Sequence, residues 1–215
     1  MTKFDLASTD LLLSTTRAVR KRLDLGRPID SSLIVDCIRL SQQAPTGSNR
    51  QGWRWIVITD VEKRKIIADY YRTSAGNYLE DAKNAAINRN AVQDTKVFES
   101  AQYLADNMDA VPVQIIPCID TSHIPFDAPG HKWLALGGSI FPAIWSFQLA
   151  LRARGLGSCI TTLHLAYENE ISDLIGVPTS FSQVALLPVA YTKGTDFKPA
   201  KRPPVDEIVH WNKWE

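Results

Sequence analysis

A stretch of 19 residues without a charged side chain, from Trp133 to Leu151, constrains the fold of this chain more than any other segment. It approaches the roughly 20 apolar residues that a membrane-spanning helix requires. Its glycines, serines, proline and glutamine dilute the hydrophobicity too far for a bilayer. We therefore predict a soluble protein whose central helix, at 133–154, is buried on all sides, with a subunit interface as one source of cover.

The bulk composition is that of a single globular domain. The chain has 215 residues, 45% of them hydrophobic and 22% charged, and a net charge of +1. This charge provides no general basic field, so we expect no nucleic-acid partner. We also expect no membrane partner and, because the N-terminus lacks a signal-peptide pattern, a cytoplasmic protein.

The cysteines and histidines do not indicate a metal site. Cys37, Cys118 and Cys159 have no CxxC spacing and lie among apolar neighbours, which predicts buried reduced thiols rather than disulfides or zinc ligands. Reduced thiols also fit the cytoplasm. The four histidines lack metal-ligand spacing as well.

Hydrophobic periodicity and turn residues predict alternating helices and strands. Helices are expected at 30–44, 61–72, 133–154 and 168–175, and strands at 53–59, 111–119, 158–163 and 184–191. Ser31 or Ser32 can cap the first helix, and two prolines favour an edge position or a bulge for strand 111–119. The alternation fits one α/β or α+β sandwich with helices on both faces of a sheet.

Two basic segments could each bind a phosphate, because arginine forks match phosphate oxygens. The first, TTRAVRKR at 15–22, carries Arg17, Arg20, Lys21 and Arg22. The last, DFKPAKRPPVDEIV at 196–209, carries Lys198, Lys201 and Arg202 on a proline-rich extended chain. Taken alone, the first is explained more simply as a solvated turn, and the last equally well as a solvated tail.

Two further segments could bind a planar ring or a polyol. In QAPTGSNRQGW at 43–53, the side chains of Thr46, Ser48, Asn49 and Gln51 offer donors and acceptors, and Gly47 can adopt a positive φ. An ordinary loop between helix and strand explains this segment equally well. In GLGSCITT at 155–162, the glycines follow a helix and precede a strand, so they indicate a helix C-cap rather than a dinucleotide fingerprint. Thr161 and Thr162 could donate hydrogen bonds to a ring nitrogen or simply be strand residues.

In this order the segments resemble the motifs of the FMN-dependent nitroreductase superfamily, including its iodotyrosine deiodinase branch. The R-S-V-R motif is similar to Arg17–Arg20, with Ala18 for serine. The A-P-S-x-x-N-x-Q-P-W motif is similar to Ala44–Trp53, with Thr46 for serine and Gly52 for proline. The G-L-G-T helix end is similar to 155–158, and the K-R-x-P-x-D stretch to 201–206. The resemblance covers about residues 14–210.

The resemblance implies an α+β fold, a nitroreductase-like three-layer sandwich with a central mixed sheet, helices on both faces and an interlocked dimer. Residues 1–215 would form a single domain with a C-terminal arm at about 195–215 that wraps the partner and covers Trp211 and Trp214.

It also implies an FMN site shared between the subunits of a homodimer. Arg17, Arg20 and Arg202 would hold the phosphate, with Lys201 a weaker candidate. Thr46 and Asn49 would reach the ring or ribityl chain from the other subunit, and residues 160–162 would approach flavin N5. The implied cofactor-binding residues are Arg17, Ala18, Val19, Arg20, Pro45, Thr46, Gly47, Asn49, Gln51, Ile160, Thr161, Thr162, Lys201 and Arg202.

The implied activity is NAD(P)H-dependent reduction of small-molecule acceptors such as nitroaromatics or quinones in a ping-pong mechanism. No dedicated catalytic residue is expected, because the flavin performs the chemistry with support from Thr161 and Thr162. Two alternatives remain open. One is reductive dehalogenation, for which Tyr78, Glu80 and Lys83 have suitable chemistry, and the other is a flavin-binding protein without turnover.

Overall fold

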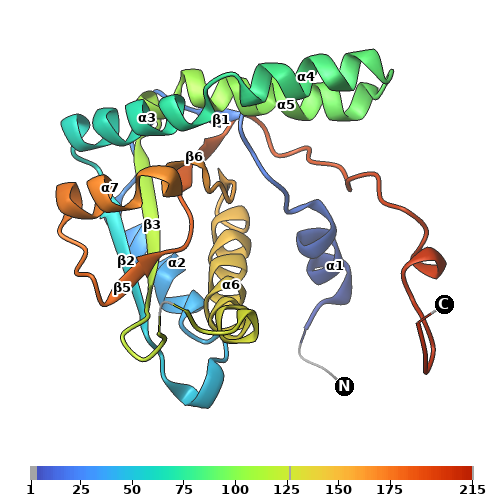
Figure 1. Ribbon diagram of the computed structural model, residues 1–215. Helices are drawn as coiled ribbons and strands as arrows, with labels where there is room; N and C mark the ends of the chain where they lie inside the picture. Colours follow the sequence, from blue (N-terminus) through green and yellow to red (C-terminus); the bar gives the residue numbers. More distant parts are fainter. Residues whose placement is uncertain (1–3, 126, 215) are drawn as a thin grey trace.

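The strand β3 (Val113–Asp120) occupies the centre of a six-stranded sheet. The computed structural model describes residues 4–125 and 127–214, and Figure 1 shows their arrangement. β3 pairs with β2 (Trp53–Ile58) on one side and with β6 (Leu187–Thr192) and β5 (Phe181–Gln183) on the other. The short strands β1 (Leu23–Asp24) and β4 (Leu156–Ser158) both pair with β6.

The sandwich is confirmed as α+β, but the expected mixed sheet is wrong for the described residues. Every pair among these strands is antiparallel. Each of the three strands that contact β3 runs opposite to it, so no parallel pair can form around the central strand.

Pro117 lies in this central strand, so the predicted edge position is wrong. The other predicted alternative, a bulge, agrees with the one-residue shift of register between the pairs Ile115–Leu187 and Cys118–Gln183. Its carbonyl accepts a hydrogen bond of 2.9 Å from the Val184 backbone N–H. Backbone N–H and C=O of one residue point to the same side of a strand. The side of Pro117 that lacks an N–H therefore faces a gap between two pairings. β6 pairs with β3 as far as Ile115, and β5 pairs with it from Cys118 onward.

Helices cover both faces of the sheet, as expected. On one face α3 (Val61–Ala75), α5 (Val92–Asp106) and α7 (Glu168–Ile175) pack with Ile116 and Cys118. On the other, α2 (Ser31–Ser41) and α6 (Gly130–Arg152) pack with Val113, Ile115 and Ile119. Alternate residues of β3 thus supply two separate cores.

Several element boundaries differ from the sequence-based expectations. The cap of α2 is Asp30, whose carboxylate accepts from the Ser32 N–H, and not a serine. The strand expected at 158–163 is β4 at 156–158, while α7 matches its predicted range. The helices α1 (Leu6–Thr15) and α4 (Tyr78–Asn88) and the strands β1 and β5 were not predicted.

The long helix α6 is not buried on all sides within this chain. By length and composition it is the one described helix that could cross a membrane, and 39% of its apolar window is buried. Trp133, Leu134, Phe141 and Trp145 remain exposed, Leu134 by 78%. The packed half faces α2 and the sheet, so α6 behaves as a core helix with one uncovered apolar face.

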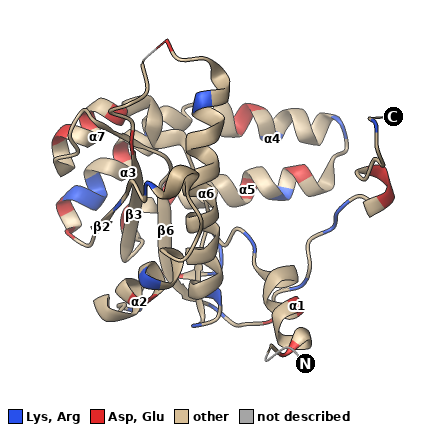
Figure 2. Cartoon of the chain, turned by 90° about the horizontal axis from the view of Figure 1, so that it is seen from below, with Lys and Arg blue, Asp and Glu red and all other residues tan. Residues whose placement is uncertain are grey.

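Both ends of the chain lie away from the sheet. α1 and the arm that follows Lys198 extend outside the body in two perpendicular views (Figures 1 and 2). The arm ends with Trp211 and Trp214 exposed by 84% and 89%. Large apolar side chains with this exposure are more typical of interaction surfaces than of ordinary solvent-facing segments.

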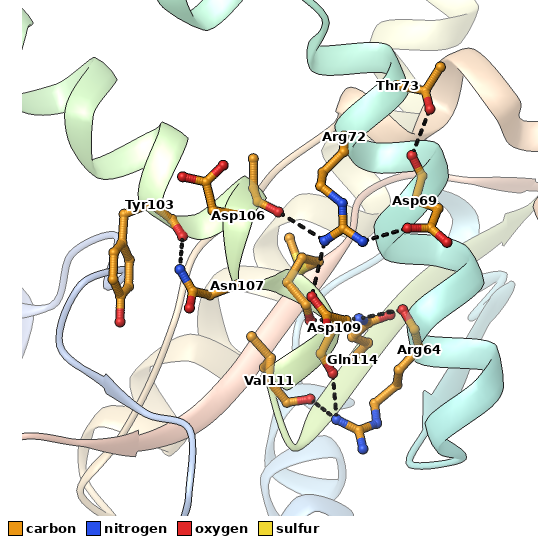
Figure 3. A network of polar contacts seen from close by, with 12 residues as sticks. Arg64, Asp69, Arg72, Thr73, Tyr103, Asp106, Asn107, Asp109, Val111 and Gln114 are labelled. Atoms are coloured by element: carbon orange, nitrogen blue, oxygen red, sulfur yellow. Dashed lines mark hydrogen bonds and ion pairs between the residues drawn. The ribbon is translucent and has the colours of Figure 1, made fainter.

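Two arginines of α3 hold the connection between α5 and β3 in place (Figure 3). Arg64 donates to the carbonyls of Asp109 and Val111. Arg72 bridges the carboxylates of Asp69 and Asp109. The buried Gln114 donates to the carbonyls of Arg64 and Met108. Together these bonds fix α3 against the start of the central strand.

His164 is fully buried in the 3₁₀ helix Leu163–Tyr167, and neither ring nitrogen has a hydrogen-bond partner. Burial lowers its pKa from 6.5 to about 4. The folded protein therefore holds this ring neutral at pH values at which the unfolded chain protonates it.

We expect the free energy of unfolding to fall as the pH drops from about 6.5 to about 4, because only the unfolded chain binds the His164 proton in this window. The contribution is roughly 3 kcal/mol. Urea unfolding across this range measures it. His164→Leu should flatten that part of the profile, whereas His131→Gln, at an exposed histidine, should not. Equal pH slopes for His164→Leu and the wild type would contradict the expectation.

Candidate functional site

The first basic segment folds around a cavity of about 220 Å³, which we call the basic cavity. Its lining residues are Arg17, Ala18, Val19, Arg20, Lys21, Arg22, Ser100, Asp196, Phe197 and Lys198. Five of these carry a positive charge and one a negative charge, so the cavity attracts anions. The structure thus brings the first basic segment together with the start of the last one.

Gly157 lets the basic segment approach the sheet. A Cβ at this position would lie 2.8 Å from Thr192 Cγ2 and 2.9 Å from Val19 Cβ. The Val19 N–H donates to the Ser158 carbonyl over 2.9 Å. The second glycine of the 155–158 motif is therefore required for close packing. The helix α6 ends at Arg152 with Ala153 as its C-cap, so the predicted glycine cap is wrong, and Gly155, with φ of 74°, lies in the turn that follows.

The base of the C-terminal arm is fixed against the same segment by Phe197. The guanidinium groups of Arg22 and Arg152 lie 4.1 Å and 4.5 Å from its ring centroid. Arg22 also pairs with Asp196 at 2.6 Å, and Arg17 Nη1 donates to the Lys198 carbonyl at 3.2 Å. These contacts hold Lys198 at the basic cavity. The sequence placed Lys198 in a segment that could bind a phosphate, but the implied cofactor-binding set did not include it.

Lys201 and Arg202 lie farther along the arm. Both are exposed, neither lines the basic cavity, and Arg202 Nη1 donates to the Lys201 carbonyl at 3.2 Å. Their role at a phosphate stays a prediction.

Thr161 is held by a buried phenol. The hydroxyls of Thr161 and Tyr71 are 2.8 Å apart, and Tyr71 is only 2% exposed. Burial raises the pKa of Tyr71, so its phenol stays protonated and can donate to the threonine oxygen. Ile160 and Thr162 flank this position and are exposed.

Arg20 lines the basic cavity and also lies near Tyr71, the hydrogen-bond partner of Thr161. Its charge acts on both Tyr71 and Cys159, lowering the pKa of each. Burial nevertheless raises the pKa of the Cys159 thiol to about 11, so this cysteine is not a nucleophile. Arg17, Arg20 and Thr161 therefore lie in one region of the folded structure.

The segment at 44–53 forms a strained turn beside a second cavity, which we call the turn cavity. Ser48, Asn49 and Gln51 have φ values of 53°, 52° and 51°. Such left-handed residues cost about 1 kcal/mol or more each and gather at functional sites. Gly47 is not in this conformation, so the expectation that it supplies the positive φ is wrong. It is small because a Cβ would lie 3.3 Å from Ser139 Oγ.

Ser139 of α6 fastens this turn. Its hydroxyl accepts from the Gly47 N–H at 3.0 Å and donates to the Ala135 carbonyl at 3.1 Å. Its carbonyl accepts from the Trp53 indole at 2.7 Å. Nothing in the sequence marks this serine, because its function depends on packing between distant segments.

The turn cavity has a volume of about 520 Å³. Its lining residues are Thr46, Gly47, Ser48, Arg50, Gly52, Trp53, Ile119, Asp120, His123, Ile124, Lys132, Ala135, Leu136 and Ser139. It shares no residue with the basic cavity. The turn precedes the first residue of β2, opposite Ile119, whereas β1 joins the sheet at the far end of β6. One chain therefore places the two parts of the expected site at opposite ends of its sheet.

The sequence profile of the Nitroreductase family matches residues 13–191. The chain belongs to this family. Iodotyrosine deiodinase from Drosophila melanogaster is 26% identical over 186 residues, 85% of this chain and 61% of that protein. Iodotyrosine deiodinase 1 from Rattus norvegicus is 26% identical over 202 residues, 92% of this chain and 67% of that protein. The chain thus spans about three fifths of the first relative and two thirds of the second.

Solved structures confirm the nitroreductase-like fold. An oxidized iodotyrosine deiodinase bound to FMN and 3-iodo-L-tyrosine superposes with a TM-score of 0.67 at 20% identity, over 94% of this chain and 98% of that one. The FMN and NADPH-dependent nitroreductase NfnB from sphigopyxis sp. strain HMH gives a TM-score of 0.67 at 20% identity, over 95% and 99%.

We expect Ser139→Ala to destabilise the protein by about 1 kcal/mol, because the Gly47 N–H loses its acceptor. Ser146→Ala, a half-buried serine on the same helix, is the matched control. Urea unfolding of both variants measures the difference. If the two lose the same stability, Ser139 does not fasten the turn.

Proposed function

We propose that this protein is an FMN-dependent oxidoreductase that transfers reducing equivalents from NAD(P)H to nitroaromatic, quinone or similar acceptors in a ping-pong mechanism. The observation that carries the proposal is the basic cavity beside the fixed Thr161 hydroxyl, in a chain of the Nitroreductase family. Bound FMN would supply hydride and electron transfer, and the protein would supply binding, orientation and charge.

The donor set of the basic cavity fits the phosphate of FMN. Arg17 and Arg20 provide forked guanidinium groups, and Lys198 adds a third cation from the arm. Charge-assisted bonds of this kind are roughly twice as strong as neutral ones. The backbone N–H of Val19 already donates to the Ser158 carbonyl, so the phosphate would be bound by the side chains around Val19.

The protonated Tyr71 can donate to Thr161, which leaves the threonine hydrogen free for an acceptor on the ring. This holds the Thr161 hydroxyl in place without a catalytic acid or nucleophile. The backbone of Ile160 and Thr162 would face the same edge of the flavin ring.

A homodimer would complete the site. The turn with Thr46, Gly47, Asn49 and Gln51 lies at the far end of the sheet from Arg17, so a two-fold partner is the simplest way to bring such parts together. The exposed apolar face of α6 and the arm with Trp211 and Trp214 support the same proposal. Pro45 begins this turn and would contact the cofactor from the second copy.

Reductive dehalogenation is the second candidate, favoured by the match to two iodotyrosine deiodinases. Tyr78 and Glu80 are exposed on the first turn of α4 and Lys83 is half-buried on the same helix. Loss of iodide from 3-iodo-L-tyrosine under reducing conditions would support this activity, and its absence alongside nitroaromatic reduction would exclude it.

The visible spectrum of the purified protein tests the cofactor, and NAD(P)H oxidation with a nitroaromatic tests the activity. A protein that neither contains FMN nor binds added FMN would contradict the proposal. Stoichiometric FMN without NAD(P)H oxidation across nitroaromatics and quinones would instead indicate a flavin-binding protein without turnover.

We expect Arg17→Gln and Lys198→Gln each to weaken FMN binding about tenfold, the loss of one charge-assisted contact. Riboflavin, which lacks the phosphate, should bind all variants alike. Titration followed by flavin fluorescence measures both affinities. Lys201→Gln is the informative comparison, because Lys201 lies outside the basic cavity. Equal losses for FMN and riboflavin would show that these side chains do not bind the phosphate.

A further inference from the structure

The turn cavity shares Thr46 and Gly47 with the proposed cofactor site, but it also carries positive charge that none of the proposed cofactor contacts uses. Its charged or titratable lining residues are Arg50, Asp120, His123 and Lys132. Arg50 and Lys132 make no ion pair with a carboxylate among residues 4–125 and 127–214. The excess is therefore available to a ligand.

Asp120 offsets only one of the two positive charges of Arg50 and Lys132. Its carboxylate accepts a bond of 2.9 Å from the Ser122 N–H. Hydrogen bonds from Ser122 lower its pKa, and the nearby His123 and Arg50 lower it further. The carboxylate is thus ionised and offsets part of the charge of Arg50, so Arg50, Asp120 and Lys132 together leave one net positive charge at the cavity.

Gly52 is what brings Asp120 so close to the turn. A Cβ at residue 52 would lie 3.2 Å from Asp120 Cβ, and the Gly52 carbonyl accepts from the Asp120 N–H at 2.9 Å. The glycine therefore allows a charged residue at this wall.

The rest of the cavity suits a flat apolar group. Trp53, Ile119, Ile124 and Leu136 line it, and its volume of about 520 Å³ lies within the range of ordinary small-molecule sites. Lys132 lies in the first turn of the 23-residue α6, where the positive end of the helix dipole adds to its charge.

We propose that the turn cavity selects aromatic acceptors that carry a carboxylate, with the ring against the apolar wall and the carboxylate at Arg50 and Lys132. This inference rests on the proposed function for the source of electrons. A nitrobenzoate would take two electrons and two protons, releasing one water and leaving the nitroso compound. NAD(P)H would give up one hydride, and one proton would come from solvent.

The test compares 4-nitrobenzoate with 4-nitrobenzamide, its neutral isostere, using the FMN-loaded protein. We expect Lys132→Gln and Arg50→Gln each to lower the ratio of kcat/KM for the two acceptors about threefold to fivefold, through KM of the anion, as for a partly exposed charge pair. Raising the salt concentration should weaken only the reaction with the anion. Lys65→Gln, at an exposed lysine of α3 outside the cavity, should change neither.

Binding of benzoate, which cannot be reduced, gives a readout independent of turnover. Calorimetry should show benzoate binding more tightly than benzamide, with the difference reduced in both variants. Unchanged ratios in Lys132→Gln and Arg50→Gln would overturn the inference while leaving the proposed function intact if 4-nitrobenzamide is reduced. A higher KM for NAD(P)H with an unchanged acceptor ratio would assign these cations to the electron donor and would also overturn it. If neither acceptor is reduced, the proposed function fails, and benzoate binding still decides what the cavity selects.

Discussion

The burial of β3 on both faces is the constraint on which the rest of the structure depends. Its residues from Val113 to Ile119 are all buried, so both sides of the sheet need a helical layer. The side chains of Ile116 and Cys118 fix α3, α5 and α7 on one face, and those of Ile115 and Ile119 fix α2 and α6 on the other. Because α6 must cover one face, Ser139 comes to lie where it can hold the 46–52 turn.

The same arrangement explains why one chain holds the two parts of the proposed site apart. The turn is attached where β2 begins, and the basic segment is attached where β4 and β6 meet, through Gly157 and Val19. An antiparallel sheet separates these attachment points by the length of its strands. The apolar surfaces left over, on α6 and the arm, are the ones that a second copy would cover.

Much of this could be predicted from the sequence, where local chemistry decides the outcome. The periodicity of 168–175 gave α7, and the first two motifs fall on the two cavities. Predictions were wrong at positions whose structure depends on contacts between segments far apart in the sequence. Pro117 is central because two partner strands leave a gap at its position, and Gly47 is needed for the approach of Ser139 rather than for a turn. Lys198 is absent from the implied cofactor-binding set for the same reason, because Phe197, which holds it at the basic cavity, contacts Arg22 from 175 residues away.

Gly52 shows how a departure from a motif can carry information. The motif that this segment resembles has a proline at this position, where the chain has Gly52. In the structure its missing side chain lets Asp120 pack at 3.2 Å from the position of a Cβ, and Asp120 in turn lies beside Arg50 and His123. A proline ring at residue 52 would crowd the Cβ of Asp120 and so shift the carboxylate that this side chain carries. The substitution is therefore tied to the electrostatics of the turn cavity, which links a backbone detail to the proposed selection of the acceptor.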